Sequence, residues 1–229
     1  MIKQLQSGIA PLILSCLLLT GSSNGEVIGG VEFPLGNLSF ADQVHSFSLG
    51  TDSTTQTDPL QALGPPDTPP TSNAVSLGDG GVLVVEFINN RLVDQDDVES
   101  GLDLFVFEVG PTSGGLVENF RLEISKDNAS YIDLGEFQGE TTGVDIKPFI
   151  NPGDEFQYVR ITDLAPNTSP APVAGADIDA VGAIGSVVIP EPSSLAICST
   201  LLVGLTARRR TKLGVATRRD HQTFQLSRF

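Results

Sequence analysis

Short segments in which apolar and polar residues alternate dominate residues 26–189, and no part of this region shows a sustained helical repeat. In the segment 120–125, for example, apolar residues hold the even positions and polar residues the odd ones, as in a strand with one buried face. We expect clear strands at 81–87, 103–109, 120–125, 131–134, 156–162 and 177–184, and weaker ones at 46–49 and 74–77. Gly, Pro, Asn and Asp residues mark the turns between them, and this pattern predicts an all-β fold, a two-sheet antiparallel β-sandwich over residues 26–187.

An apolar segment near the N-terminus lies outside the strand-forming region. Lys3 precedes an apolar run at 9–20, and small residues follow at 21–25. A basic start, a short apolar run and small residues predict a secretory signal peptide over residues 1–25. Cys16 leaves a lipoprotein signal as an alternative, although the apolar run continues past this cysteine.

Residues 188–210 combine a Pro-Glu-Pro sequence, a short apolar stretch and an arginine cluster. The residues concerned are Pro190, Glu191, Pro192, Arg208, Arg209 and Arg210. The two prolines keep the backbone extended ahead of the apolar stretch. As a helix, the 15 residues between Pro192 and Arg208 would be about 22 Å long, which is shorter than a hydrocarbon core of about 30 Å. The positive-inside rule places the arginines in the cytoplasm and the sandwich outside it.

This three-part segment resembles the PEP-CTERM sorting signal of exosortase-equipped bacteria. The resemblance implies that a transmembrane helix holds the chain transiently in the inner membrane. An exosortase-type enzyme then cuts near the Pro-Glu-Pro sequence, and the protein reaches the cell surface or the extracellular matrix. Proteins of this kind usually end soon after the arginines, whereas this chain continues through residues 211–229, which we interpret as a basic cytoplasmic tail.

The chain has a formal net charge of −15, and the acidic residues are concentrated in the sandwich. Residues 26–189 contain 26 acidic and 5 basic side chains, a net charge of −21. Such a surface repels phosphate backbones, which excludes nucleic acids as partners. Cys16 and Cys198 both lie in the terminal apolar segments, and His45, which we expect at the surface, is the one histidine of residues 26–189. A metal centre built from cysteines or from several histidines is therefore excluded.

A second resemblance covers residues 63–184. Six short motifs follow one another there: LGPPD at 63–67, SLGDGG at 76–81, DLFVFE at 103–108, EISKD at 123–127, YVRITD at 158–163 and DIDAV at 177–181. The ordered series resembles the bacterial cell-surface domain found in many exported sorting-tag proteins, which is related to the galactose-binding-like jelly rolls. The resemblance implies a jelly-roll surface module of largely unassigned activity.

Asp177 and Asp179 are the main candidates for a chemical site. Residues two apart in a strand share a face at a spacing of about 6.5–7 Å, where two carboxylates repel each other unless a cation or an arginine neutralises them. Other carboxylates that can converge on them are Asp67, Asp103, Glu108 and Asp163. Oxygen ligands without His or Cys favour calcium, here as a structural ion. The alternative is that these carboxylates are solvated or paired with Arg121 or Arg160.

These features favour an exported, non-enzymatic protein of the cell surface or extracellular matrix. The alternative is a carbohydrate-binding module of the exopolysaccharide matrix, although the chain contains no Trp and has only two tyrosines, Tyr131 and Tyr158, for stacking on sugars. An exposed ring on a concave sheet face would favour this alternative. A third hypothesis, a hydrolase, needs two carboxylates about 5–9.5 Å apart in a cleft, and no pair stands out among the 26.

Overall fold

The computed structural model describes residues 25–67, 73–95, 101–109, 118–138, 141–165 and 171–189. Within these ranges the chain forms thirteen β-strands and three short 3-10 helices. The strands are β1 (Glu26–Ile28), β2 (Val31–Phe33), β3 (Gln43–Ser48), β4 (Val75–Ser76), β5 (Val82–Glu86), β6 (Asn90–Leu92), β7 (Leu104–Glu108), β8 (Asn119–Ser125), β9 (Tyr131–Gln138), β10 (Thr141–Val144), β11 (Tyr158–Asp163), β12 (Asp177–Ala183) and β13 (Ser186–Val188). The 3-10 helices are η1 (Gly36–Ser39), η2 (Pro59–Ala62) and η3 (Lys147–Phe149).

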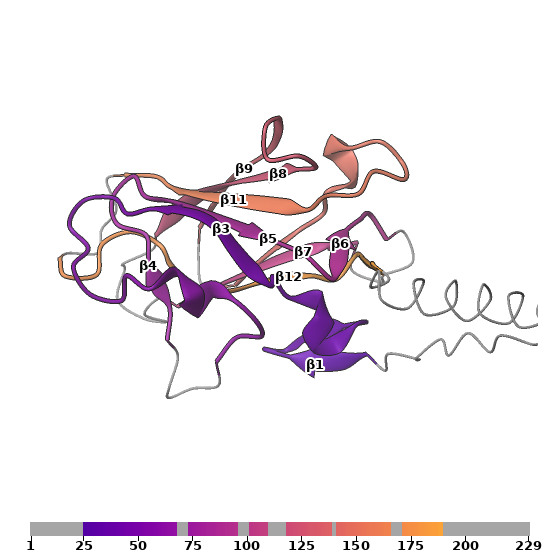
Figure 1. Ribbon diagram of the computed structural model, residues 1–229, viewed down its shortest axis with the longest axis horizontal. Coiled ribbons are helices and arrows are strands. Elements are labelled where there is room, and N and C mark those ends of the chain that lie inside the picture. Colours follow the sequence, from indigo (N-terminus) through magenta and orange to yellow (C-terminus); the bar gives the residue numbers. More distant parts are fainter. Residues whose placement is uncertain are drawn as a thin grey trace, which may run out of the picture.

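Most of the strands belong to two antiparallel sheets that lie face to face (Figure 1). The four-stranded sheet has the order β10-β7-β12-β4, and the five-stranded sheet has the order β3-β5-β11-β8-β9. Two small ribbons, β1-β2 and β13-β6, complete the described strands. The predicted all-β fold of antiparallel sheets is confirmed.

The strand pairing is that of a jelly roll. Eight strands form four antiparallel pairs nested within one another. The outermost pair is β4 with β12, followed by β5 with β11, β7 with β10 and, innermost, β8 with β9. A long hairpin that curls over itself into two sheets produces this pairing. The topology therefore agrees with the jelly roll that the resemblance implied.

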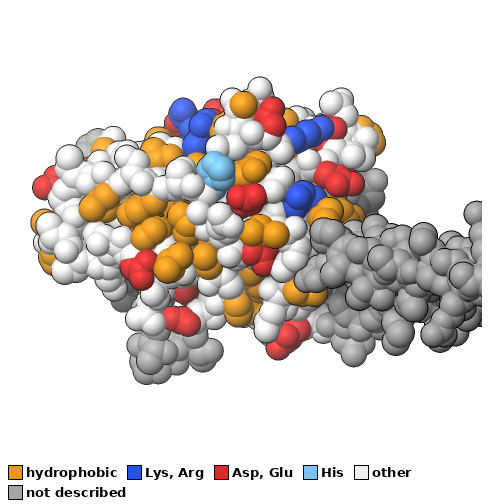
Figure 2. All heavy atoms as spheres, viewed as in Figure 1, with side chains coloured by type: hydrophobic (Ala, Val, Ile, Leu, Met, Phe, Trp, Pro, Cys, Tyr) orange, Lys and Arg blue, Asp and Glu red, His pale blue; other side chains and the backbone are white. Residues whose placement is uncertain are grey.

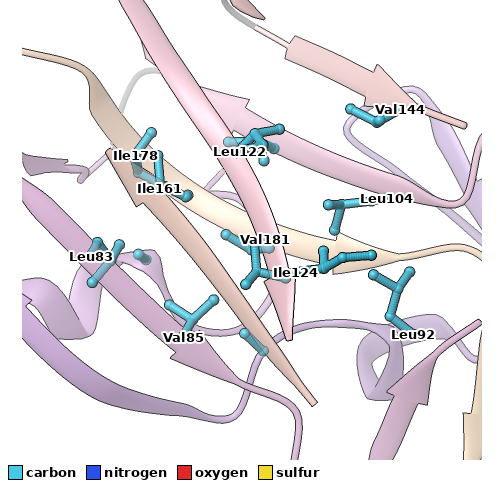
Figure 3. Close-up of a cluster of buried hydrophobic side chains, with 14 of the residues drawn as sticks. Leu83, Val85, Leu92, Leu104, Leu122, Ile124, Val144, Ile161, Ile178 and Val181 are labelled. Carbon is cyan, nitrogen blue, oxygen red and sulfur yellow. The ribbon is translucent and has the colours of Figure 1, made fainter. Parts of the chain in front are cut away.

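Alternating residues of the strands fill the space between the sheets. Leu83 and Val85 of β5 and Leu122 and Ile124 of β8 all belong to this core, and all four side chains are fully buried. Figure 3 shows these residues pointing toward side chains of the opposite sheet, such as Val181 of β12. The alternation that predicted strands at 81–87 and 120–125 is thus the pattern of one inward and one outward face.

The two sheets differ on their outer faces. A second apolar cluster covers the four-stranded sheet, where Phe33 of β2 and Phe40, next to η1, pack on Phe105 and Phe107 of β7. All five residues of β7 are buried as a result, because the strand has apolar neighbours on both faces. The outward residues of the five-stranded sheet are mostly polar and exposed or half-buried. That face is therefore accessible to a ligand.

The predicted signal peptide, the Pro-Glu-Pro sequence with its arginine cluster, the transmembrane helix and the basic tail lie outside the described residues. Among the described residues, no helix has both the length and the apolar character needed to cross a membrane.

Candidate functional site

The six carboxylates that the sequence singled out do not converge on one site. Asp103 precedes β7 and Glu108 ends it, so the two lie at opposite ends of this strand, about 16 Å apart along the backbone. Asp103 is buried and accepts main-chain hydrogen bonds from Gln95 at 3.0 Å and from Ile146 at 3.1 Å. Burial raises the pKa of Asp103. This carboxylate ties two loops together, and its role is structural.

Asp163, the last residue of β11, is also a structural carboxylate. Its Oδ2 accepts a hydrogen bond from the amide of Gly80 and its Oδ1 accepts one from the amide of Ala176, both at 2.9 Å. The side chain is 2% exposed, so these amides supply the hydrogen bonds that solvent would otherwise give. Asp163 thereby fixes the loops that lead into β5 and β12.

Asp177 and Asp179 have different neighbours, because a β-bulge interrupts β12. Ile178 pairs with Glu108 and Ala180 pairs with Phe107, which leaves Asp179 as the extra residue between them. Asp179 accepts a hydrogen bond from the amide of Asp67 at 3.1 Å, and burial, together with the charge of Asp67, raises its pKa to about 6. The strict alternation assumed from the sequence does not hold across a bulge.

Asp177 instead lies near two buried glutamates, and we call Glu108, Glu118 and Asp177 the acidic cluster. Burial, and then the charge of Glu118, raises the pKa of Glu108 to about 9. Burial also raises the pKa of Asp177 to about 7, although the Ser76 hydroxyl acts in the opposite direction. The cluster therefore retains protons that exposed carboxyl groups would release, and it carries less negative charge than its composition indicates.

The structure does not show the predicted pairing of these carboxylates with Arg121 or Arg160. Arg160 pairs with Glu123, and Arg121 pairs with Glu136 and Asp133, so neither arginine neutralises any of the six. Four of the six are buried rather than solvated: Asp103, Glu108, Asp163 and Asp179. In the part of the chain that the structure describes, no three His, Cys, Asp or Glu side chains are grouped so that they could hold a metal ion. A structural calcium ion stays a prediction from the sequence.

The open face of the five-stranded sheet carries a different arrangement, which we call the tyrosine platform. It consists of His45, Glu86, Glu123, Asn128, Tyr131, Tyr158 and Arg160. All five strands contribute to it, because β11 lies between β5 and β8 in the sheet. Cross-strand register places Tyr158 opposite Glu86 on one side, and Arg160 opposite Glu123 on the other.

Arg160 anchors one half of the platform. Its Nε and Nη2 each donate to an oxygen of Glu123 at 2.5 Å, which makes a bidentate ion pair. The guanidinium carbon also lies 3.7 Å from the centre of the Tyr131 ring, so the cation stacks on this ring. Burial raises the pKa of Tyr131, and its protonated hydroxyl donates to Oδ1 of Asn128.

The other half of the platform continues from Asn128 to Glu86. Asn128 has a left-handed backbone, with φ of 57°, in the turn between β8 and β9, a conformation that asparagine tolerates well. Its Nδ2 lies 2.7 Å from Nε2 of His45, and Nδ1 of His45 lies 3.4 Å from Oε2 of Glu86. Tyr158 packs edge-on against the imidazole, with ring centres 5.1 Å apart. These contacts join the side chains into one continuous network across the sheet.

The platform is accessible. The side chain of His45 is 34% exposed, in agreement with its predicted surface position, and that of Arg160 is 31% exposed. Figure 2 shows the histidine of the described residues, in pale blue, on the surface among hydrophobic, acidic and basic side chains. The sequence alone did not identify this site. The outward positions of Tyr158 and Arg160 in one strand were visible as alternation, but the strands that flank β11 come from distant segments.

A cleft of about 420 Å³ lies at the opposite end of β8 and β9. It is lined by Asn119, Glu136, Phe137, Gln138 and Leu164. Its volume suits a small ligand. However, its one aromatic ring, Phe137, stacks on Phe120 with ring centres 6.5 Å apart and belongs to the core packing. The tyrosine platform is therefore the better candidate for a recognition surface.

Comparison with known proteins identifies no family for this chain. No family model matches it, and no curated protein matches it. Several solved structures resemble it at low identity. A CBM32 domain of AlyQ, in complex with 4,5-unsaturated mannuronic acid, is 12% identical, with a TM-score of 0.39 over 63% of this chain and 96% of that one. The C-terminal domain of a chitobiase from Bacteroides fragilis is 10% identical, with a TM-score of 0.37 over 68% and 99%.

The third structure is a CBM32 domain produced by Clostridium perfringens, in complex with GlcNAc-α-1,4-galactose. It is 12% identical, with a TM-score of 0.39 over 64% of this chain and 92% of that one. Similarity at this level carries no conclusion about what this chain binds, so its function has to be argued from the platform itself.

Proposed function

We propose that this domain binds glycans on the tyrosine platform and catalyses no reaction on them. The observation that carries the proposal is that both tyrosines of the chain lie on the one open sheet face, inside a network of polar side chains. A pyranose ring has an apolar face and a rim of hydroxyl groups. Aromatic rings surrounded by hydrogen-bonding side chains complement both parts of such a ring.

The platform is also organised before a ligand arrives. Asn128 contacts both Tyr131 and His45, while Glu86 accepts a hydrogen bond from Gln157 at 2.6 Å. Side chains that already hold one another lose little conformational entropy when a ligand binds. This favours recognition of a ligand that offers many weak hydrogen bonds, as a polysaccharide does.

A protein partner fits this face less well, because the centres of protein interfaces are apolar. Among the described residues, the exposed large hydrophobic side chains are Val27, Leu38, Leu49, Leu60, Ile88, Phe149, Val187 and Val188. None of these lies within the five strands of the platform sheet. The open face therefore offers rings and polar groups without an aliphatic centre.

The platform carboxylates are poorly suited to catalysis. A glycosidase needs one carboxyl group that stays protonated to act as an acid, beside a second carboxylate. Glu123 is held as the partner of Arg160, and the groups with pKa values raised to about 9 and 7, Glu108 and Asp177, belong to the other sheet. We therefore propose a binding role alone.

The route to the cell surface is a separate part of the proposal, and it is supported by the sequence alone. The signal peptide at residues 1–25 and the sorting segment at residues 188–210 favour export, a transient membrane anchor and processing by an exosortase-type enzyme. A glycan-binding domain released by this route would meet exopolysaccharide outside the cell.

A glycan array probed with the full chain, purified in mild detergent, tests the binding function. We expect binding to at least one polysaccharide class, and at least about tenfold weaker binding by Tyr158→Ala, because the ring supplies stacking area. Phe149→Ala is the matched control, since it removes an exposed ring outside the platform. An array without any bound glycan, or equal effects of the two variants, would contradict the proposal.

A further inference from the structure

We infer that the glycan recognised by the platform is uncharged, a neutral polysaccharide rather than one that carries carboxylate or sulfate groups. This inference rests on the proposed function, and it concerns the chemistry of the ligand. It comes from the way in which the basic side chains around the platform are already used.

Basic residues are scarce in this domain. Residues 26–189 contain five of them: Arg91, Arg121, Lys126, Lys147 and Arg160. Arg121 and Arg160 lie on strands of the platform sheet, and Lys126 directly follows β8. Arg91 is the fourth cation to consider, because it lies close enough to Tyr158 for its charge to act on that side chain.

Arg91 is held by the main chain, because its Nη1 donates to the carbonyl oxygens of Phe87, Ile88 and Asn90. The other three are each paired with a carboxylate of the domain itself. Lys126 lies 2.6 Å from Asp154, and Arg121 lies 2.7 Å from Glu136. Arg160 is the cation within the platform, and two of its sides are already in contact with other side chains. Its Nε and Nη2 edge, the fork that would grip a carboxylate or sulfate, is occupied by Glu123, and its flat face rests on Tyr131.

The remaining charges of the face are negative. Glu86 lies 3.4 Å from the imidazole of His45, and Asp133 is shared with an arginine that already pairs with Glu136. The net charge of −21 over residues 26–189 adds a repulsive field for any anion that approaches. Sugar hydroxyl groups, in contrast, can donate hydrogen bonds to these carboxylates without repulsion.

Matched pairs of polysaccharides test the inference. Each pair consists of an acidic polymer, such as alginate or polygalacturonate, and the same polymer with its carboxyl groups chemically reduced to neutral alcohols. The full chain is assayed for binding at low salt in the presence of a chelator. We expect at least about tenfold tighter binding to the reduced member of any pair that binds, and a smaller difference at high salt, because salt screens the repulsion.

Glu123→Gln sharpens the test, because it frees the Arg160 fork for an external carboxylate. This variant should gain affinity for acidic polymers relative to their reduced forms. Glu136→Gln, which removes one of the two carboxylate partners of Arg121 outside the platform, should not. Tighter binding of the acidic member by the unmodified protein would overturn the inference while leaving glycan binding intact. Failure to bind any neutral or acidic glycan, in the array and in this assay, would overturn the proposed function itself.

Discussion

The acidic cluster makes folding stability depend on pH in a direction opposite to that of most acidic proteins. Burial raises the pKa of Glu108 from 4.5 to about 9 and that of Asp177 from 3.8 to about 7. Above pH 4.5 the unfolded chain releases protons that the folded chain retains, so each rise in pH favours the unfolded state. The loss extends to about pH 7 for Asp177 and to about pH 9 for Glu108.

The size of this effect follows from the linkage between proton binding and folding. In its titration window each group lowers the free energy of unfolding by roughly 1 kcal/mol per pH unit, after an allowance for solvent screening. Both groups titrate in this sense between pH 5 and pH 7, so the free energy of unfolding falls by about 3–4 kcal/mol over this range. For a domain of this size we expect the melting temperature to fall by roughly 10 °C.

Thermal melts followed by circular dichroism between pH 5 and pH 9, at constant ionic strength, measure this dependence. Glu108→Gln should flatten the curve and melt at a higher temperature than the unmodified protein at pH 8, because its amide cannot ionise. Glu155→Gln, at an exposed acidic residue, is the control and should leave the slope unchanged. A melting temperature that stays constant or rises from pH 5 to pH 7 would refute the reasoning.

Two further predictions concern the predicted metal ion and the packing of the four-stranded sheet. The predicted calcium site requires that millimolar calcium raise the melting temperature at pH 8, and that the double variant Asp177→Ala with Asp179→Ala abolish this rise. A melting temperature that calcium does not change would show that the site does not exist. Gly182→Ala should lower the free energy of unfolding by about 1–3 kcal/mol, because the added Cβ would lie 2.7 Å from the Phe33 ring and 2.9 Å from the Phe40 ring. An unchanged midpoint of urea unfolding would show that the rings adjust freely.

The sequence predicted the sandwich well where one strand face is buried and the other is not. The alternation at 120–125 is that of β8, in which Leu122 and Ile124 point into the core. The run at 103–109 also predicted a strand, but it gave no indication that β7 is buried on both faces. That burial depends on Phe33 and Phe40, whose contacts with β7 are distant in the sequence. Periodicity describes a strand and does not identify its neighbours.

For the candidate site, too, the sequence predicted the direction of individual side chains but not which strands lie next to one another. Asp177 and Asp179 were expected to share a face, because the period of a strand is two residues. One extra residue in β12 separates their environments, and no local feature of the sequence announces the bulge. The tyrosine platform depends equally on long-range order, since the jelly-roll pairing places β11 between β5 and β8. The outward direction of the platform side chains was predictable from the sequence, but the contacts between side chains from different strands were not.

The outer faces of the two sheets differ, and the recognition surface that we propose lies on the open one. The phenylalanines of the outer cluster cover the four-stranded sheet, which also contributes Glu108 and Asp177. The tyrosines and the paired arginine remain on the open sheet. Because the platform and the acidic cluster share no residue, titration of Glu108 can change stability without altering the platform. The cations on or beside that face already bind carboxylates of the domain or, for Arg91, main-chain carbonyls, and this arrangement favours the neutral ligand that we infer.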